Sequence, residues 1–83
     1  MEVAILPHAL ERAELRGATA EEIIETVRQG EQAPAKLGRT IFTLNHPGRW
    51  MWRERSYDTK QLEVIAVFED GAWLAITVIV KFF

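Results

Sequence analysis

The chain has 83 residues, of which 48% are apolar and 27% charged, with a formal net charge of −2. These values are typical of a globular domain and exclude collagen-like, low-complexity and disordered chains. Cysteine is absent, which excludes disulfides, thiolate zinc sites and thiol catalysis and is compatible with a reducing cytoplasm. A domain this small buries a small core, so we expect either efficient packing or stability shared with a partner.

No segment resembles an export signal or a membrane span. Glu2 stands where a signal peptide has Lys or Arg, and the apolar run that follows it ends at Pro7. The apolar run from Leu74 to Val80 is much shorter than the roughly 18–20 residues that a membrane-spanning helix needs. We therefore expect a soluble cytoplasmic protein with no membrane partner.

Charge is unevenly distributed along the chain. Residues 1–31 hold seven acidic residues against three arginines, whereas residues 36–60 hold six basic residues against two acidic ones. The net charge is not that of a nonspecific nucleic-acid-binding protein, but the basic middle segment is compatible with a local anion-binding patch. An ordinary solvated face is the alternative.

The first elements expected along the chain are a short edge strand and a helix. Residues 2–6 are rich in apolar side chains, and Pro7 supplies a fixed φ that suits the first turn of a helix over residues 7–16. Gly17 follows the last residue of that pattern, where a left-handed residue commonly ends a helix.

A second helix follows directly. Thr19 and Glu22 have the spacing of a capping box. Residues 30–39 contain two glycines and one proline without periodicity, and they are predicted to be a connection. The apolar residues that recur at helical spacing before Gly30 are Ala20, Ile23, Ile24 and Val27.

Four strands, arranged as two hairpins, are predicted in the rest of the chain. The first hairpin turns at residues 45–48, which include Pro47 and Gly48, and its second strand ends at residues 58–60. The second hairpin turns at Asp70-Gly71, a pair typical of tight hairpins. The expected strands are 40–44, 49–57, 61–68 and 72–80.

This order of elements predicts a single α+β domain over residues 1–83, with both N-terminal helices packed on one face of a four-stranded antiparallel sheet. On the other face, aromatic side chains would form an exposed patch that binds a second copy of the chain or an antitoxin-like protein. The expected core residues are Leu10, Ile23, Ile24, Val27, Val64, Ala66, Phe68, Ile76 and Val78. The expected aromatic patch consists of Phe42, Trp50, Trp52 and Trp73.

The sequence lacks the common enzyme motifs. It contains no nucleotide-binding glycine loop, no zinc-protease motif and no pair of carboxylates on one face. The two histidines, His8 and His46, lie far apart without a ligand pattern around them. We therefore expect no metal and no other cofactor, and we interpret His46 as a turn residue.

One stripe along the first helix combines groups suited to phosphate chemistry. His8, Arg12 and Arg16 are spaced four residues apart and so lie on one face. A guanidinium binds phosphate in bidentate fashion, and an imidazole titrates near neutral pH. Cleavage of an RNA phosphodiester needs proton transfer and a stabilised phosphorane, so these three are the candidate catalytic residues. The alternative is a surface stripe in which the arginines pair with Glu11 and Glu14.

A second group of candidates lies in the basic middle segment. Arg53, Arg55 and Tyr57 alternate along one predicted strand and would bind phosphates and stack on a base. Trp50 and Trp52 are expected on the opposite face of that strand. A charged solvent face that protects a sheet edge is the alternative. The candidate substrate-binding residues are Arg39, Arg53, Arg55, Tyr57 and Lys60.

Much of the chain resembles a family of small bacterial and archaeal domains. The segments that carry the resemblance are HALERAELRGATAEEIIETVRQGE, GRTIF and LEVIAVFEDGAWLAITVIV. Residues that match the family pattern are His8, Ala9, Arg12, Arg16, Gly17, Ile23 or Ile24, Gly38, Arg39, Val64, Ile65 and Ile76 to Val78. The family is similar to the RelE-like and BrnT-like ribonuclease toxins, which are grouped with barnase-like and colicin-type nucleases. This resemblance implies a metal-independent endoribonuclease whose site lies where the His8 stripe meets the sheet. Thr77 interrupts an apolar strand, so its hydroxyl either bonds to the strand backbone or is a polar group on the floor of that site.

Two hypotheses follow from the sequence. In the first, His8 is the general acid or base and the two arginines bind the scissile phosphate of RNA. In the second, the domain is a non-catalytic module whose arginines bind a protein partner or an anion. Ribosome-dependent toxins of this group are strongly basic, whereas this chain has a net negative charge. An exposed His8 beside a basic hollow is expected of the first hypothesis, and a buried His8 bonded to the backbone of the second.

Overall fold

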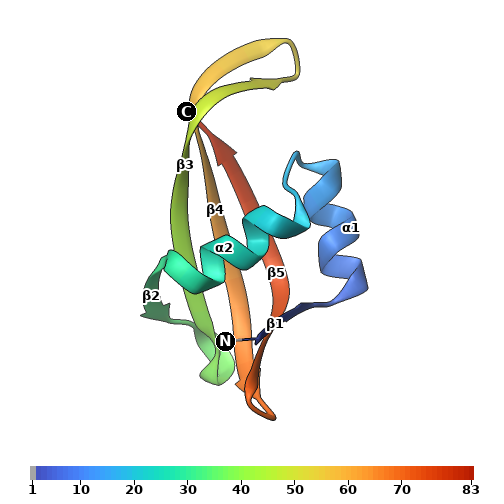
Figure 1. Cartoon of the computed structure of the whole chain (residues 1–83), viewed down its shortest axis with the longest axis vertical. Helices are drawn as coiled ribbons and strands as arrows, with labels where there is room; N and C mark the ends of the chain where they lie inside the picture. Colours follow the sequence, from blue (N-terminus) through green and yellow to red (C-terminus); the bar gives the residue numbers. More distant parts are fainter. Residues whose placement is uncertain (1) are drawn as a thin grey trace.

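A five-stranded mixed sheet and two helices make up the fold seen in a computed structural model, which describes residues 2–83 (Figure 1). The helices are α1 (Pro7–Leu15) and α2 (Ala20–Gln29). The strands are β1 (Glu2–Ile5), β2 (Glu31–Pro34), β3 (Thr40–Trp52), β4 (Arg55–Glu69) and β5 (Ala72–Phe82), and a short 3-10 helix, η1 (Lys36–Gly38), separates β2 from β3. The expected α+β class is confirmed.

The sheet has the strand order β1-β5-β4-β3-β2. Strand β1 pairs in parallel with β5, and the other neighbouring strands pair antiparallel. The short edge strand expected at residues 2–6 is confirmed as β1. The prediction of a sheet of four antiparallel strands was wrong, because β1 joins the sheet in parallel and residues 31–34 of the expected connection form the opposite edge as β2.

The helix boundaries follow from the local sequence. Pro7 stands in the first turn of α1, where its missing N–H costs no hydrogen bond. In α2, the Thr19 hydroxyl accepts from the backbone N–H of Glu22, and the Glu22 carboxylate accepts from the backbone N–H of Thr19. The capping box expected there is confirmed.

Strands β3 and β4 are longer than the sequence indicates. Residues 45–48, expected to form a turn, instead continue β3, which has a bulge between Pro47 and Trp50, and residues 58–60 continue β4. Pro47 fits there because β2 pairs with β3 only between Thr40 and Thr43, so its missing N–H faces an unpaired edge. The hairpin turns later, at Arg53-Glu54, whereas the predicted turn at Asp70-Gly71 is confirmed.

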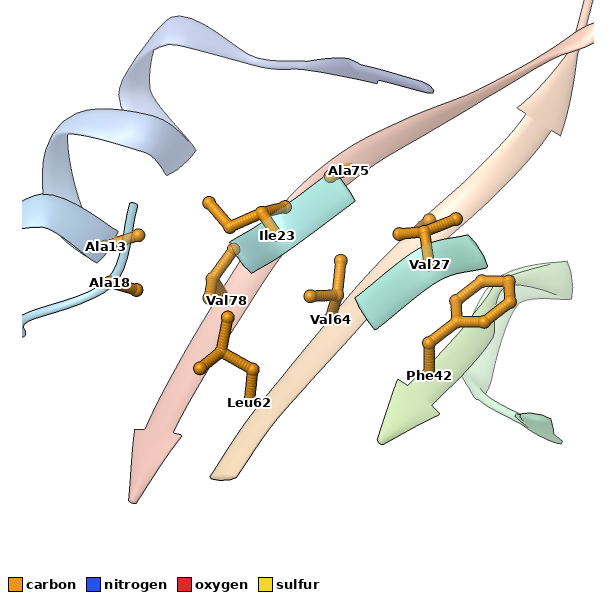
Figure 2. Close-up of a cluster of buried hydrophobic side chains, with 10 residues drawn as sticks. Ala13, Ala18, Ile23, Val27, Phe42, Leu62, Val64, Ala75 and Val78 are labelled. Carbon is orange, nitrogen blue, oxygen red and sulfur yellow. The ribbon is translucent and has the colours of Figure 1, made fainter. Parts of the chain in front are cut away.

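The core lies between the helices and the sheet (Figure 2). Side chains alternate along β4, so that Leu62, Val64 and Ala66 are buried against α2 and their neighbours are not. Of the nine expected core residues, Ile23, Val27, Val64, Ala66 and Val78 are buried. Leu10 packs against this core, Ile24 and Ile76 are half-buried, and Phe68 is 55% exposed.

The aromatic patch expected on the opposite face does not form. Phe42 is fully buried in the core, and the Trp73 ring meets its edge with the two centroids 4.9 Å apart. Trp52 stacks on Phe82, whose register partner across the sheet is Lys60 on the helix-facing side. The aromatic side chains therefore extend the core along the sheet, because their strands alternate in phase with Leu62.

Candidate functional site

A hollow of about 280 Å³ lies between α1 and β5. Its lining residues are His8, Ala9, Arg12, Arg16, Ile76, Thr77 and Val78. They come from two segments of the sequence that are far apart, one on the helix and one on the strand. The structure thus brings the three candidate catalytic residues together with Thr77.

Two arginines give this hollow a positive charge that no carboxylate among its lining residues offsets. The Arg16 guanidinium donates to the backbone carbonyl of Val78 at 3.3 Å, which fixes it against the strand. Within residues 2–83, neither Arg12 nor Arg16 forms an ion pair, so the pairing with Glu11 and Glu14 offered by the surface-stripe alternative is not seen.

His8 stands in the second position of α1 and is exposed to solvent. It lines the same hollow as both arginines. Thr77, also exposed, comes from the strand side, and its hydroxyl is a donor and an acceptor. The hollow therefore combines an imidazole ring, two guanidiniums and a hydroxyl group.

Arg53, Arg55 and Tyr57 lie at the far end of the β3–β4 hairpin. We call residues 49–57 the arm. In the arm Trp52 pairs with Arg55, and Trp50 with Tyr57. Directly paired residues share a face of an antiparallel sheet, so the expectation that both tryptophans face away from Arg55 was wrong. The cause is the turn at Arg53-Glu54, which makes β3 and β4 partners where one continuous strand was expected.

Lys60 is not available to a nucleotide. It is 3% exposed, and its ammonium donates to the Gly17 carbonyl at 2.7 Å and to both Glu22 carboxylate oxygens at 2.9 Å. The ammonium also lies 3.9 Å from the centroid of the Trp50 ring. The structure thus contradicts a substrate-binding role, because Lys60 shares the buried face of β4 with Leu62.

Arg39 lies at the other end of β3, after η1. It is exposed and borders a separate hollow of about 430 Å³ formed by residues of β2 and the loop that follows it. The structure does not bring Arg39 to the hollow of His8 or to the arm. Arg39 therefore has no shared site with the other candidate substrate-binding residues.

A polar network beneath the arm was missed by the sequence analysis. The Thr26 hydroxyl donates to the Glu22 carbonyl at 2.7 Å and therefore accepts from Nε2 of His46 at 3.2 Å. The Trp50 indole donates to the His46 carbonyl at 2.8 Å. His46 thus ties β3 to α2, and a lone histidine within a predicted turn carries no signal of that interaction.

The surroundings of Glu22 lower the pKa of its carboxyl group. Burial by itself raises the pKa of this carboxyl group. The hydrogen bonds from Lys60 and Thr19 and the positive charge of Lys60 outweigh burial, so its pKa lies below the ordinary value of 4.5. Glu22 is therefore the negative partner of the buried ammonium at neutral pH.

Residues 2–83 contain no cluster of three or more side chains with metal-ligating groups, and neither helix is long and apolar enough to cross a membrane. Comparisons of the chain with protein-family models, with curated proteins and with solved structures found no match.

Proposed function

We propose that the hollow between α1 and β5 binds a phosphodiester of RNA and cleaves it with side chains of this chain alone. The observation that carries the proposal is the convergence of His8, Arg12 and Arg16 in one hollow without a neutralising carboxylate among its lining residues. Two guanidiniums that form no ion pair within residues 2–83, beside an exposed imidazole, are suited to a phosphate. The hollow is a little smaller than pockets for drug-sized ligands, which have volumes of roughly 300–1,000 Å³.

A role for each side chain follows from the chemistry of the reaction. Neutral His8 accepts the proton of the 2′-hydroxyl, whose oxygen attacks phosphorus, while the P–O5′ bond breaks and the leaving oxygen takes a proton from water. The products are a 2′,3′-cyclic phosphate and a 5′-hydroxyl. Arg12 and Arg16 donate to the phosphorane oxygens, where negative charge develops. Thr77 donates to a non-bridging oxygen.

The resemblance seen in the sequence gives separate support. Its pattern includes His8, Ala9, Arg12, Arg16 and residues 76–78, which are the residues that line the hollow. The resemblance thus covers both segments that form the hollow, and helical spacing independently indicates one of them, the stripe of His8, Arg12 and Arg16. If the proposal holds, the chain is the ribonuclease of a toxin–antitoxin pair, and an antitoxin-like protein is its partner.

The test is RNA cleavage by the wild-type chain and by His8→Ala, with the fold of both checked by circular dichroism. We expect growth arrest and fragmented total RNA on induction of the wild type, and a loss of cleavage of about 100-fold or more in the variant, as for removal of a general base. Arg12→Lys against Arg12→Gln is the matched pair, since lysine keeps the charge and loses the bidentate fork.

Intact RNA in the presence of a folded wild-type chain contradicts the ribonuclease proposal. The hollow then belongs to a non-catalytic module. In that case Arg12→Gln weakens the binding of an anion or of an acidic protein segment. His8→Ala leaves that binding unchanged.

A further inference from the structure

The arm extends beyond the two helices at one end of the molecule (Figure 1). The molecule is accordingly elongated, with principal dimensions of 41 × 23 × 22 Å. The network of Lys60 and His46 supports the base of the arm, and residues 51 and 53–56 are exposed. The tip of the arm is therefore open to a large ligand.

The turn at the tip has an unusual sequence for its backbone. Arg53 has a φ of 50° and Glu54 a φ of 66°, a left-handed pair that Asn-Gly adopts without strain. The other hairpin has the same pattern at Asp70-Gly71, with φ values of 54° and 77°. One hairpin of this molecule thus has favourable turn residues, and the other keeps strained Arg and Glu. Strain of this kind is a reason to look for a function of the side chains involved.

The arm is basic in a protein with a negative net charge. Arg49, Arg53 and Arg55 are exposed there, against the single acid Glu54. None of these arginines forms an ion pair within the described chain. The Arg53 guanidinium lies 5.7 Å from the centroid of the half-buried Trp52 ring, which is itself stacked on Phe82. The exposed guanidinium plane is therefore the surface on which an unpaired base can stack.

The arm and the hollow are connected through Gly17. Gly17, next to Arg16 of the hollow, packs so closely on the arm that an added methyl group would lie 3.0 Å from Cζ3 of Trp52. Lys60 holds the same residue through its carbonyl. An RNA strand that runs from the hollow past Arg16 is therefore directed toward Trp52 and the tip of the arm.

We infer that the arm binds the nucleotides flanking the phosphate held in the hollow, and that the substrate is single-stranded RNA. Arg53 and Arg55 pair with phosphates, and an unpaired base stacks on the Arg53 guanidinium beside Trp52. The inference rests on the proposed function. It narrows the substrate to unpaired RNA that is long enough to reach from the hollow to the arm.

The experiment measures binding of a fluorescent oligouridylate of about 12 nucleotides, a length within the usual range of single-strand sites, by anisotropy. All proteins carry His8→Ala, so that no RNA is cleaved. The first variant is Arg53→Asn/Glu54→Gly, which removes the arginine, reduces the backbone strain of the turn and leaves the net charge unchanged. The second is Arg55→Gln, and Lys36→Gln in η1 is the control for loss of one charge at the other end of the molecule.

We expect each arm variant to weaken binding by about fivefold or more. The slope of the logarithm of the binding constant against the logarithm of salt concentration should become shallower by about 0.7 for each phosphate that the protein no longer neutralises. The control is expected to stay within about twofold of the parent protein, because a distant surface charge contributes little at moderate salt. An RNA duplex of the same length is expected to bind less tightly.

Three results overturn the inference: unchanged affinity in both arm variants, a similar loss in Lys36→Gln, or tighter binding of the duplex. Cleavage by the His8-containing wild type is measured on the same oligonucleotide. If it cleaves while the arm variants bind normally, only the arm inference fails. If the arm variants lose affinity and the wild type does not cleave, the proposed function fails, and the role of the arm in binding RNA is supported.

Discussion

Lys60 is a positively charged residue inside the fold, on the face of β4 that the helices cover. Basic residues at positions 53, 55 and 60 suggest one charged surface, yet Lys60 is buried with three acceptor atoms around its ammonium. A buried ammonium is tolerated when it is paired and hydrogen-bonded. Its partners come from the turn between the helices and from α2, so Lys60 stabilises the junction of helices and sheet.

Replacement of Lys60 by methionine is expected to destabilise the fold by about 2–4 kcal/mol. The change leaves Glu22 without its counter-charge and the Gly17 carbonyl without its donor. Urea unfolding at neutral pH measures the loss. Lys81→Met is the matched control, because Lys81 pairs with Glu63 at 3.2 Å on the surface, and such pairs contribute about 0–1 kcal/mol. Equal losses in the two variants would contradict the buried-pair interpretation.

At the scale of elements, the two hairpin turns differ in sequence while they share a backbone conformation. Asp70-Gly71 has the residues that a two-residue turn with positive φ favours, and Arg53-Glu54 does not. The β3–β4 hairpin forms nevertheless because its strands pair over most of their length and bury Phe42, Leu62 and Val64. Long-range packing thus outweighs unfavourable turn chemistry at the tip.

The double substitution Arg53→Asn/Glu54→Gly is therefore expected to stabilise the protein by about 1 kcal/mol, because Asn and Gly adopt the left-handed conformation with less strain than Arg and Glu. For a domain of this size the melting temperature rises by about 4–8 °C. Calorimetry or a thermal melt followed by circular dichroism checks the rise. A lower melting temperature would show that Arg53 and Glu54 make stabilising contacts that outweigh the strain.

At the scale of the whole molecule, the helices and the sheet approach each other closely at Gly17. Gly17 has a φ of +93° and contacts the rings of Trp52 and Phe82. Only glycine combines this conformation with so close an approach. The position of α1, and with it the hollow of His8, is therefore coupled to the base of the arm.

Gly17→Ala is expected to cost about 2–4 kcal/mol, because it adds a steric clash to the strain of a left-handed alanine. Gly38→Ala isolates the strain alone, since Gly38 has a φ of +72° and no atom within 4 Å of an added methyl group, and its expected cost is about 1 kcal/mol. Chemical denaturation of both variants gives the comparison. Equal costs would mean that the tryptophan ring moves aside without penalty.

Local rules were sufficient wherever an element is determined by residues close together in the chain. The capping box of Thr19, the turn at Asp70-Gly71 and the stripe of His8, Arg12 and Arg16 on one helix face all follow from fixed spacings. The same reasoning yielded the α+β class and the residues of one side of the hollow.

Only the tertiary structure decided which strands pair, and with what register. Register places Lys60 inside, moves Phe42 into the core, keeps Pro47 within β3 and brings Thr77 to the hollow that Arg12 also lines. Strand pairing joins residues far apart in sequence, and a shift of one position exchanges the two faces. The amino-acid sequence by itself therefore determined the helices, the tight turn and the candidate catalytic stripe, whereas non-local pairing determined what that stripe faces.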